Sequence, residues 1–101
     1  MEDIIIGKNA QDNWDIINDS GPSDLWFHLN SFPSCHVIIR NSSPTEEVIQ
    51  RAAGICKDTS KYKHVKNIKV VYTTIDNIEL TLGRVGCVTI LSRRRCKTIK
   101  P

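Results

Sequence analysis

Two stretches in the first half of the chain alternate apolar and polar residues, and both are dense in aromatic and β-branched side chains. They cover residues 24–29 and 36–40, and the segment between them is rich in Asn, Ser and Pro. This pattern predicts a β-hairpin with a loop of about five or six residues. Because successive side chains of a strand point to opposite faces, Phe27 and Val37 belong to one face of the hairpin. The opposite face carries an indole, two imidazoles and a guanidinium, those of Trp26, His28, His36 and Arg40.

This second face of the hairpin has two interpretations. If the Phe27 and Val37 face forms the core, the other face is exposed, and its aromatic, imidazole and cationic groups suit stacking on bases and binding of phosphates. In the alternative, Trp26 is buried and both histidines are ordinary hydrogen-bonded strand residues. The pattern alone leaves both open.

The N-terminal segment predicts a strand followed by a helix. Residues 3–6 form a short apolar run that ends at Gly7, and apolar residues at helical spacing over 10–17 predict a short helix with Asn9 as its N-cap. Free backbone N–H groups at such a turn, beside Lys8, can bind a phosphate. Many strand-to-helix turns of this kind bind nothing.

After the hairpin, Ser43, Pro44 and Glu46 have the spacing of a capping box, with Ser43 as the N-cap of a second helix. Apolar positions extend this helix to about residue 59. Residues 67–74 predict another strand, whereas 75–82 indicate only a loop or a short helical turn.

The C-terminal segment predicts a turn and a second hairpin. Residues 83–86 contain two glycines, and 87–91 and 96–100 predict strands joined by a short connection. The three arginines Arg93, Arg94 and Arg95 would then lie at a hairpin tip. They either keep a sheet edge soluble or contact nucleic acid.

Together these elements predict an α+β domain with a mainly antiparallel sheet of about six strands and two helices packed against it. A length of 101 residues and a hydrophobic content of 40% fit one domain over 1–101. The chain has no apolar run of membrane-spanning length and no signal peptide pattern at Met1, so we expect a cytoplasmic protein without membrane contact.

The cysteines and charges narrow the candidate chemistry. The four cysteines lack C-x-x-C spacing, and the adjacent Cys35 and His36 point to opposite sides of a strand, so we expect free thiols, no metal site and no cofactor. Through Cys56 the chain has three basic and eight acidic residues, a net charge of −5. From Lys57 onward it has eleven basic and three acidic residues, a net charge of +8. This segregation favours a polyanionic partner for the second half, although a solvated basic surface without a partner is the alternative.

Several of these motifs together resemble the NFACT RNA-binding domain (NFACT-R) over nearly the whole chain. Their order and approximate spacing match those of the family at residues 6–9, Asn13, 24–28, 36–40, 70–73 and Gly86. The paired Asp-x-Trp-x-His and His-Val-x-x-Arg motifs are the more specific part. The resemblance implies recognition of structured RNA, either tRNA or ribosomal RNA. It also links the chain to the large ribosomal subunit and to the quality control of stalled nascent chains.

The resemblance also indicates which residues matter. At the positions where this chain matches the family motifs, the resemblance implies functional importance for Lys8, Asn9, Asn13, Trp26, His28, His36 and Arg40. Our own hypothesis is that Trp26 and His28 stack on or hydrogen-bond with exposed nucleotides and that Lys8 and Arg40 bind phosphates. Sequence-independent phosphate contacts would come from Lys61, Lys63, Lys66, Arg93, Arg94 and Arg95.

Two other classes of function stay open. His28 and His36 could act as an acid and base pair in a small RNA-cleaving phosphodiesterase, with Arg40 stabilising negative charge. The third class is a protein-interaction module in which the acidic first half binds a basic partner and the RNA role is lost. The binding interpretation accounts for more residues at once, so we expect no enzyme.

Overall fold

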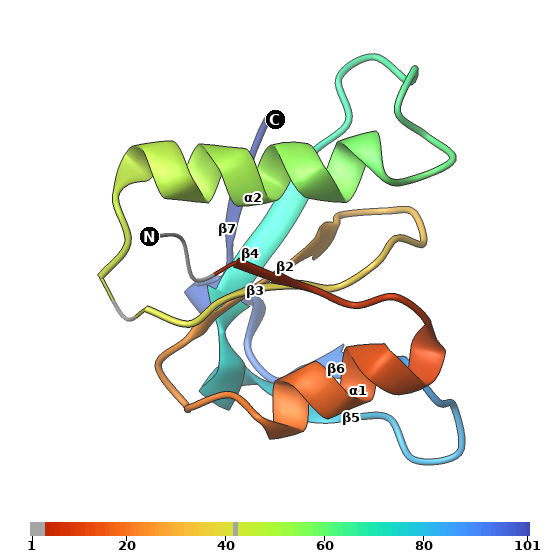
Figure 1. Cartoon of the computed structure of the whole chain (residues 1–101), viewed down its shortest axis with the longest axis vertical. Coiled ribbons are helices and arrows are strands. Elements are labelled where there is room, and N and C mark those ends of the chain that lie inside the picture. Colours follow the sequence, from red (N-terminus) through yellow and green to blue (C-terminus); the bar gives the residue numbers. More distant parts are fainter. Residues whose placement is uncertain (1–3, 42) are drawn as a thin grey trace.

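The computed structural model describes residues 4–41 and 43–101, and within these residues two α-helices pack on opposite faces of a five-stranded antiparallel sheet (Figure 1). The strand order is β1-β3-β2-β4-β7, and β5 and β6 form a separate two-stranded sheet. The predicted α+β class is therefore confirmed. The elements are β1 (Ile4–Ile6), α1 (Ala10–Asn18), β2 (Leu25–Leu29), β3 (Val37–Ile39), α2 (Glu46–Asp58), β4 (Val70–Thr74), β5 (Ile78–Leu80), β6 (Val88–Ile90) and β7 (Lys97–Ile99), with 3₁₀ turns η1 (Ile75–Asn77) and η2 (Arg93–Arg95).

The predicted central hairpin is present, and both of its faces are buried. Strands β2 and β3 pair antiparallel, with Phe27 opposite Val37. Phe27 and Val37 lie in the cluster covered by α2, whose Ala53 is fully buried. Trp26 on the other face packs with residues of α1 and β5, among them Ile17. The sheet therefore has a core on each side.

Local capping explains where α1 begins. The Asn9 side chain accepts a hydrogen bond from the backbone N–H of Asp12 at 2.8 Å, and the Asp12 carboxylate accepts one from the backbone N–H of Lys8 at 2.8 Å. The first bond satisfies a backbone donor that the first helical turn leaves free, and the second ties the residue before the cap to that turn. The predicted N-cap at Asn9 is confirmed.

The start of α2 differs from the prediction. Its N-cap is Thr45, whose hydroxyl accepts from the Val48 N–H at 3.3 Å, and not Ser43. Both residues are good caps by type. The backbone at Thr45 is extended, so the helix begins two residues later than predicted.

The predicted C-terminal hairpin was wrong. Strand β6 pairs with β5, and β7 pairs with β4 in the main sheet. The arginine segment 93–95 therefore forms the 3₁₀ turn η2 that connects the two sheets, and not a hairpin tip. The reason is that 78–80, which was predicted only as part of a loop or a short helical turn, supplies the partner strand.

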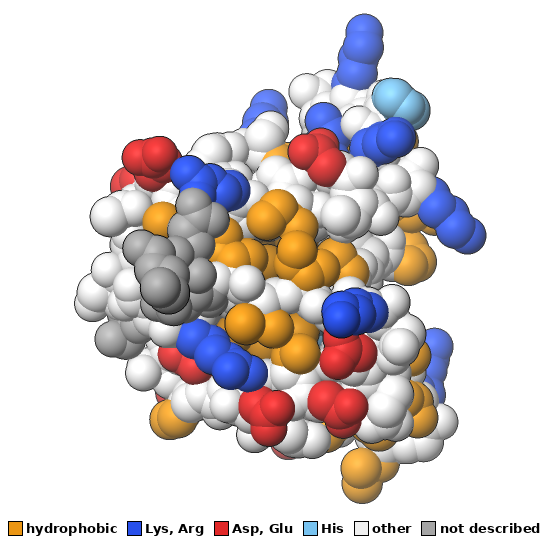
Figure 2. Space-filling view, in the orientation of Figure 1, with side chains coloured by type: hydrophobic (Ala, Val, Ile, Leu, Met, Phe, Trp, Pro, Cys, Tyr) orange, Lys and Arg blue, Asp and Glu red, His pale blue; other side chains and the backbone are white. Residues whose placement is uncertain are grey.

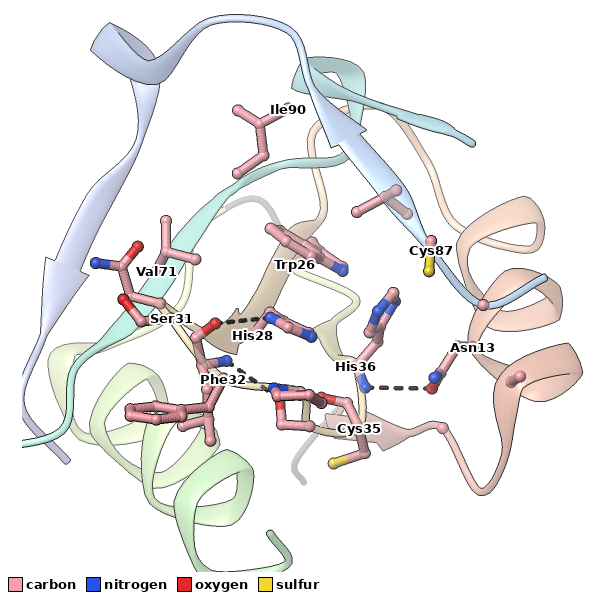
Figure 3. A pocket seen from close by; sticks show the side chains of 18 of the residues that line it. Asn13, Trp26, His28, Ser31, Phe32, Cys35, His36, Val71, Cys87 and Ile90 are labelled. Atoms are coloured by element: carbon pink, nitrogen blue, oxygen red, sulfur yellow. Dashed lines mark hydrogen bonds between the residues drawn. The ribbon is translucent and has the colours of Figure 1, made fainter. Parts of the chain in front are cut away.

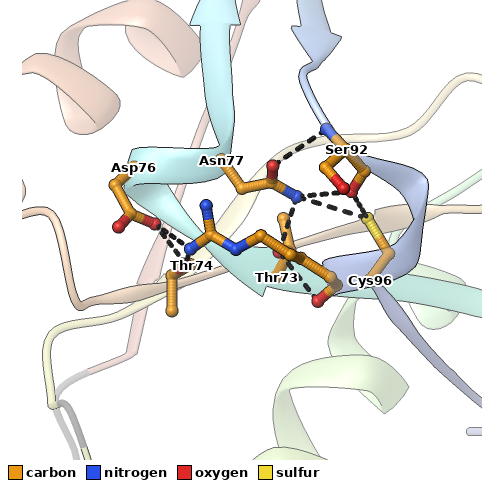
Figure 4. A network of polar contacts seen from close by, with 7 residues as sticks. Thr73, Thr74, Asp76, Asn77, Ser92 and Cys96 are labelled. Atoms are coloured by element: carbon orange, nitrogen blue, oxygen red, sulfur yellow. Dashed lines mark hydrogen bonds and ion pairs between the residues drawn. The ribbon is translucent and has the colours of Figure 1, made fainter.

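A buried asparagine joins the two sheets (Figure 4). The Asn77 amide nitrogen donates to the Thr73 hydroxyl at 3.0 Å and to the Ser92 carbonyl at 2.8 Å, and its side-chain oxygen accepts from the Ser92 N–H at 2.9 Å. Asn77 has no exposed surface. It therefore fixes the small sheet against β4.

None of the helices among the described residues is long and apolar enough to cross a membrane.

We expect Asn77→Ala to destabilise the fold by about 2–4 kcal/mol, because it leaves buried backbone groups of Ser92 without partners. Urea unfolding monitored by circular dichroism measures this change. Asn18→Ala, at the exposed end of α1, is the matched control and should change stability by less than about 1 kcal/mol. Equal losses in both variants would contradict the role of Asn77.

Candidate functional site

A pocket of about 720 Å³ lies beside the end of β2, on the face of the sheet that α1 covers (Figure 3). Its walls come from the turn between β1 and α1, the loop between β2 and β3, and the segment 85–88 before and within β6. Three parts of the chain that are distant in sequence therefore meet around one cavity. Its aromatic and imidazole lining comes from Trp26, His28, Phe32 and His36.

Three rings pack together at this cavity. Trp26 and His28 are stacked, with ring centroids 5.7 Å apart and planes within 8°. The His36 ring stands edge-on to both, at 5.5 Å from Trp26 and 5.1 Å from His28. Period-2 alternation therefore correctly predicted that these residues share one face.

The predicted exposure of that face was wrong. Trp26 is 2% exposed and His36 is 3% exposed, whereas His28 is half-buried. The cause is that α1 and the β5–β6 sheet cover this face, a contact between segments that the pattern of the hairpin does not contain. Trp26 therefore offers no free surface platform for exposed nucleotides.

Both pocket histidines are held uncharged at neutral pH. Burial lowers the pKa of His28, against a hydrogen bond to the Leu29 carbonyl that raises it. Burial, and then the neighbouring His28, lowers the pKa of His36 to about 3. The Nδ1 of His28 lies 2.7 Å from the Leu29 carbonyl oxygen. A carbonyl only accepts, so Nδ1 carries the proton and the Nε2 of neutral His28 is an acceptor.

Two polar atoms at the pocket have no protein partner. Among the buried side-chain atoms that the structure describes, Trp26 Nε1 and His36 Nδ1 make no hydrogen bond. A buried polar group without a partner costs about 1–3 kcal/mol. The alternative interpretation expected two hydrogen-bonded histidines. The ring of His28 makes such a bond, whereas Nδ1 of His36 makes none.

A buried asparagine and a glycine position the turn before α1. The Asn13 side-chain oxygen accepts from the His36 backbone N–H at 3.2 Å, and the Gly7 N–H donates to the His36 carbonyl at 2.9 Å. A Cβ atom on Gly7 would lie 1.8 Å from that Asn13 oxygen. Asn13 is thus a structural clamp between α1 and β3.

The wall formed by 85–88 is fixed by two further contacts. Gly86 has φ +88, and a Cβ there would lie 2.8 Å from the Cα of Ala10. The Trp14 Nε1–H donates to the Cys87 carbonyl at 2.8 Å. Sequence reasoning did not predict this wall, because nothing in the local pattern of 85–88 indicates contact with α1.

The predicted cationic residues separate into different places. The exposed cations Lys8 and Arg93 line the pocket. The neutral Asn9 beside Lys8 is also exposed and lines it. Arg40 is exposed at the end of β3 opposite His36 and does not line the pocket. Four residues of extended chain correspond to about 13 Å, so the structure does not bring Arg40 together with the histidines.

The three arginines also have different surroundings. The Arg95 guanidinium lies 2.7 Å from the Asp76 carboxylate and 2.9 Å from the Thr74 hydroxyl. The Thr74 hydroxyl, and next the Arg95 guanidinium, lower the pKa of Asp76. Arg94 is exposed. The arginines therefore do not act as one cationic tip.

The predicted lysines lie on the segment that follows α2. Figure 2 shows Lys and Arg side chains and one histidine at the top of the molecule, over this segment. All three lysines are exposed, namely Lys61, Lys63 and Lys66. The Tyr62 ring packs on Phe32 with centroids 4.5 Å apart. Since Phe32 lines the pocket, the lysine segment adjoins the pocket wall.

Metal chemistry has no support in the described part of the chain, which contains no group of three or more His, Cys, Asp or Glu side chains able to hold an ion. The described lining of the pocket contains no Asp or Glu. The arrangement therefore offers neutral hydrogen-bonding groups and aromatic rings inside, with cations at the opening.

Comparisons with known proteins identify related sequences. The chain is 35% identical over 88 residues to the Rqc2 homolog RqcH of Bacillus subtilis (strain 168), an alignment that covers 85% of this chain and 15% of that protein. It is 31% identical over 94 residues to coiled-coil domain-containing protein 25 of Danio rerio, covering 82% of this chain and 45% of that protein. The chain thus spans less than half the length of these relatives.

A solved structure gives the same fold. The C-terminal part of the fibronectin/fibrinogen-binding protein from Streptococcus suis superposes with a TM-score of 0.85 and 29% identity, covering 95% of this chain and 39% of that one. The family model described as NFACT protein RNA binding domain matches residues 2–90. The resemblance predicted from the motifs is confirmed, and the chain belongs to the NFACT RNA-binding domain family.

Proposed function

We propose that this chain binds structured RNA, either tRNA or ribosomal RNA. The observation that carries the proposal is a pocket with an aromatic and neutral interior whose opening bears Lys8 and Arg93. Aromatic rings stack on bases, and cations bind the phosphates beside them. Membership of an RNA-binding domain family supports the same function.

The lysine segment 61–66 extends this surface. It adjoins the pocket through the contact of Tyr62 with Phe32. A folded RNA that places a nucleotide at the pocket would pass its backbone along these lysines. Their contribution would be independent of sequence and sensitive to salt.

We also propose that the protein acts on the large ribosomal subunit in the quality control of stalled nascent chains, in the cytoplasm. The support is the family and the similarity to the Rqc2 homolog RqcH. All four cysteines are unpaired in the structure, as suits a reducing compartment. Recovery of RNA crosslinked to the protein in cells tests the proposal, with tRNA or ribosomal RNA as the expected species.

Binding should depend steeply on salt. We expect log K for a tRNA, measured by fluorescence anisotropy, to fall linearly with log salt concentration. Lys61→Ala with Lys63→Ala should reduce the magnitude of the slope by about 1.4–1.8, since each lost phosphate contact removes about 0.7–0.9. Lys97→Ala with Lys100→Ala, on and beside the edge strand β7, is the matched control and should leave the slope unchanged.

An affinity that ignores salt would contradict the proposal. Equal effects of the two double variants would show that the lysine segment holds no particular place in binding. RNA cleavage abolished by both His28→Ala and His36→Ala would instead favour the phosphodiesterase alternative.

The pocket histidines should make stability, rather than phosphate binding, depend on pH. The folded pKa of His36 is about 3, below its unfolded value of 6.5, so the unfolded chain binds more protons between these values. The stability is therefore complete above pH 6.5 and falls as the pH drops toward 3. At pH 5.5 the loss from His36 is about 1 kcal/mol, and the lowered pKa of His28 acts in the same direction.

Urea unfolding at pH 7.5 and pH 5.5 measures this loss. His36→Phe should remove the part due to His36, whereas His64→Phe, on the exposed segment after α2, should retain it. The same pH dependence in the unchanged protein, in His36→Phe and in His64→Phe would contradict the buried neutral state of His36.

A further inference from the structure

We propose that the pocket binds one unstacked nucleobase of the RNA, presented by a bulge or a loop, with the adjoining phosphates at Lys8 and Arg93. This inference rests on the proposed function, because it assumes that RNA is the ligand. It adds the part of the RNA that is recognised and the chemical groups that recognise it.

The size and construction of the cavity suit a single nucleotide. Its volume of about 720 Å³ lies within the range of about 300–1,000 Å³ typical of small-molecule sites. A duplex is too wide to enter such a cavity. A Cβ atom on Gly86 would lie 2.8 Å from the Cα of Ala10, so this wall of the cavity packs closely against the start of α1.

The interior chemistry favours a neutral heterocycle over a phosphate. His28 and His36 are uncharged at neutral pH because burial lowers the pKa of each. Phosphate oxygens require cations or several N–H donors. A base instead presents a flat apolar face together with donors and acceptors along one edge.

The free hydrogen-bonding groups match such an edge. Trp26 Nε1–H is a donor without a partner, and His36 Nδ1 also has none. The nitrogen-bearing side of the Trp26 indole is turned toward the His36 ring (Figure 3). His28 adds an acceptor at Nε2, since its Nδ1 donates to Leu29. One heterocycle that offers both a donor and an acceptor would satisfy groups that the protein leaves unpaired.

The base must already be unpaired in the free RNA. Extruding a base from a duplex costs a few kcal/mol, and this cost is least for a base that is not paired. Bulges and loops supply such bases in folded RNA. The pocket would thus explain a preference for structured RNA without requiring the protein to read a helix.

The first test compares three hairpin RNAs with the full chain by fluorescence anisotropy. The first has a single-nucleotide bulge, the second has an abasic bulge at the same place, and the third is fully paired. Hydrogen bonds to a base edge contribute about 1–3 kcal/mol, so the abasic RNA should bind about 5- to 150-fold more weakly. The slope with salt should be the same for the bulged and abasic RNAs, because their phosphates are the same.

A variant pair on one loop locates the effect. Val85 lines the pocket and is 50% exposed, whereas Leu82 is 88% exposed and does not line it. We expect Val85→Trp to fill the opening and reduce the affinity for the bulged RNA to that for the abasic RNA. Leu82→Trp should bind like the unchanged protein. Neither position belongs to the core, so both variants should fold.

The indole N–H groups of the two tryptophans report directly on binding of a base in the pocket. Trp26 Nε1–H has no partner, whereas Trp14 Nε1–H is bonded to Cys87. On addition of the bulged RNA, the indole N–H resonance of Trp26 should move downfield further than that of Trp14. The abasic RNA should produce a smaller change at Trp26.

The outcomes separate this inference from the proposed function. Equal affinities for bulged and abasic RNA, or a Val85→Trp protein that still distinguishes them, would overturn the nucleobase pocket while salt-dependent RNA binding stands. Failure to bind any of these RNAs, tRNA or ribosomal RNA would overturn both.

Discussion

Burial of strand β2 on both of its faces is the constraint on which the rest of the structure depends. Phe27 packs beneath α2, and Trp26 packs against α1 and the β5–β6 sheet. A chain of about 100 residues has little apolar area to bury, and a strand covered on both sides removes more of that area from water than one covered on a single side. Each face then needs its own cover, which explains a helix on either side of the sheet.

The cover over the Trp26 face is assembled from short pieces, and this leaves the pocket. Helix α1 has nine residues, and β5 and β6 have three each. They bury Trp26 and His36 without supplying partners for Trp26 Nε1 and His36 Nδ1. Native proteins retain few such unsatisfied groups, and those that persist call for an explanation. Recognition of a ligand would explain both unsatisfied groups, and it would use the cavity together with the cations at its opening.

Two buried asparagines hold this cover in place from separate edges. Asn13 links α1 to the backbone beside β3, and Asn77 links the small sheet to β4 and to the Ser92 backbone. Each bonds to backbone groups outside the regular strand pairing. The two walls of the pocket are therefore anchored independently. The Arg95 and Asp76 ion pair, which is half exposed, adds little to stability by comparison.

Local pattern was enough to identify the central hairpin, the cap at Asn9 and the face shared by Trp26, His28 and His36, because alternation and capping depend on neighbouring residues. The motif spacing was enough to identify the family. Whether that face is exposed was decided by contacts with α1 and β5, which lie elsewhere in the chain. The pairing of β6 with β5 likewise separated Arg93 from Arg95 in role. Burial is a property of the whole packed chain, so periodicity places a side chain on a face without determining what covers it.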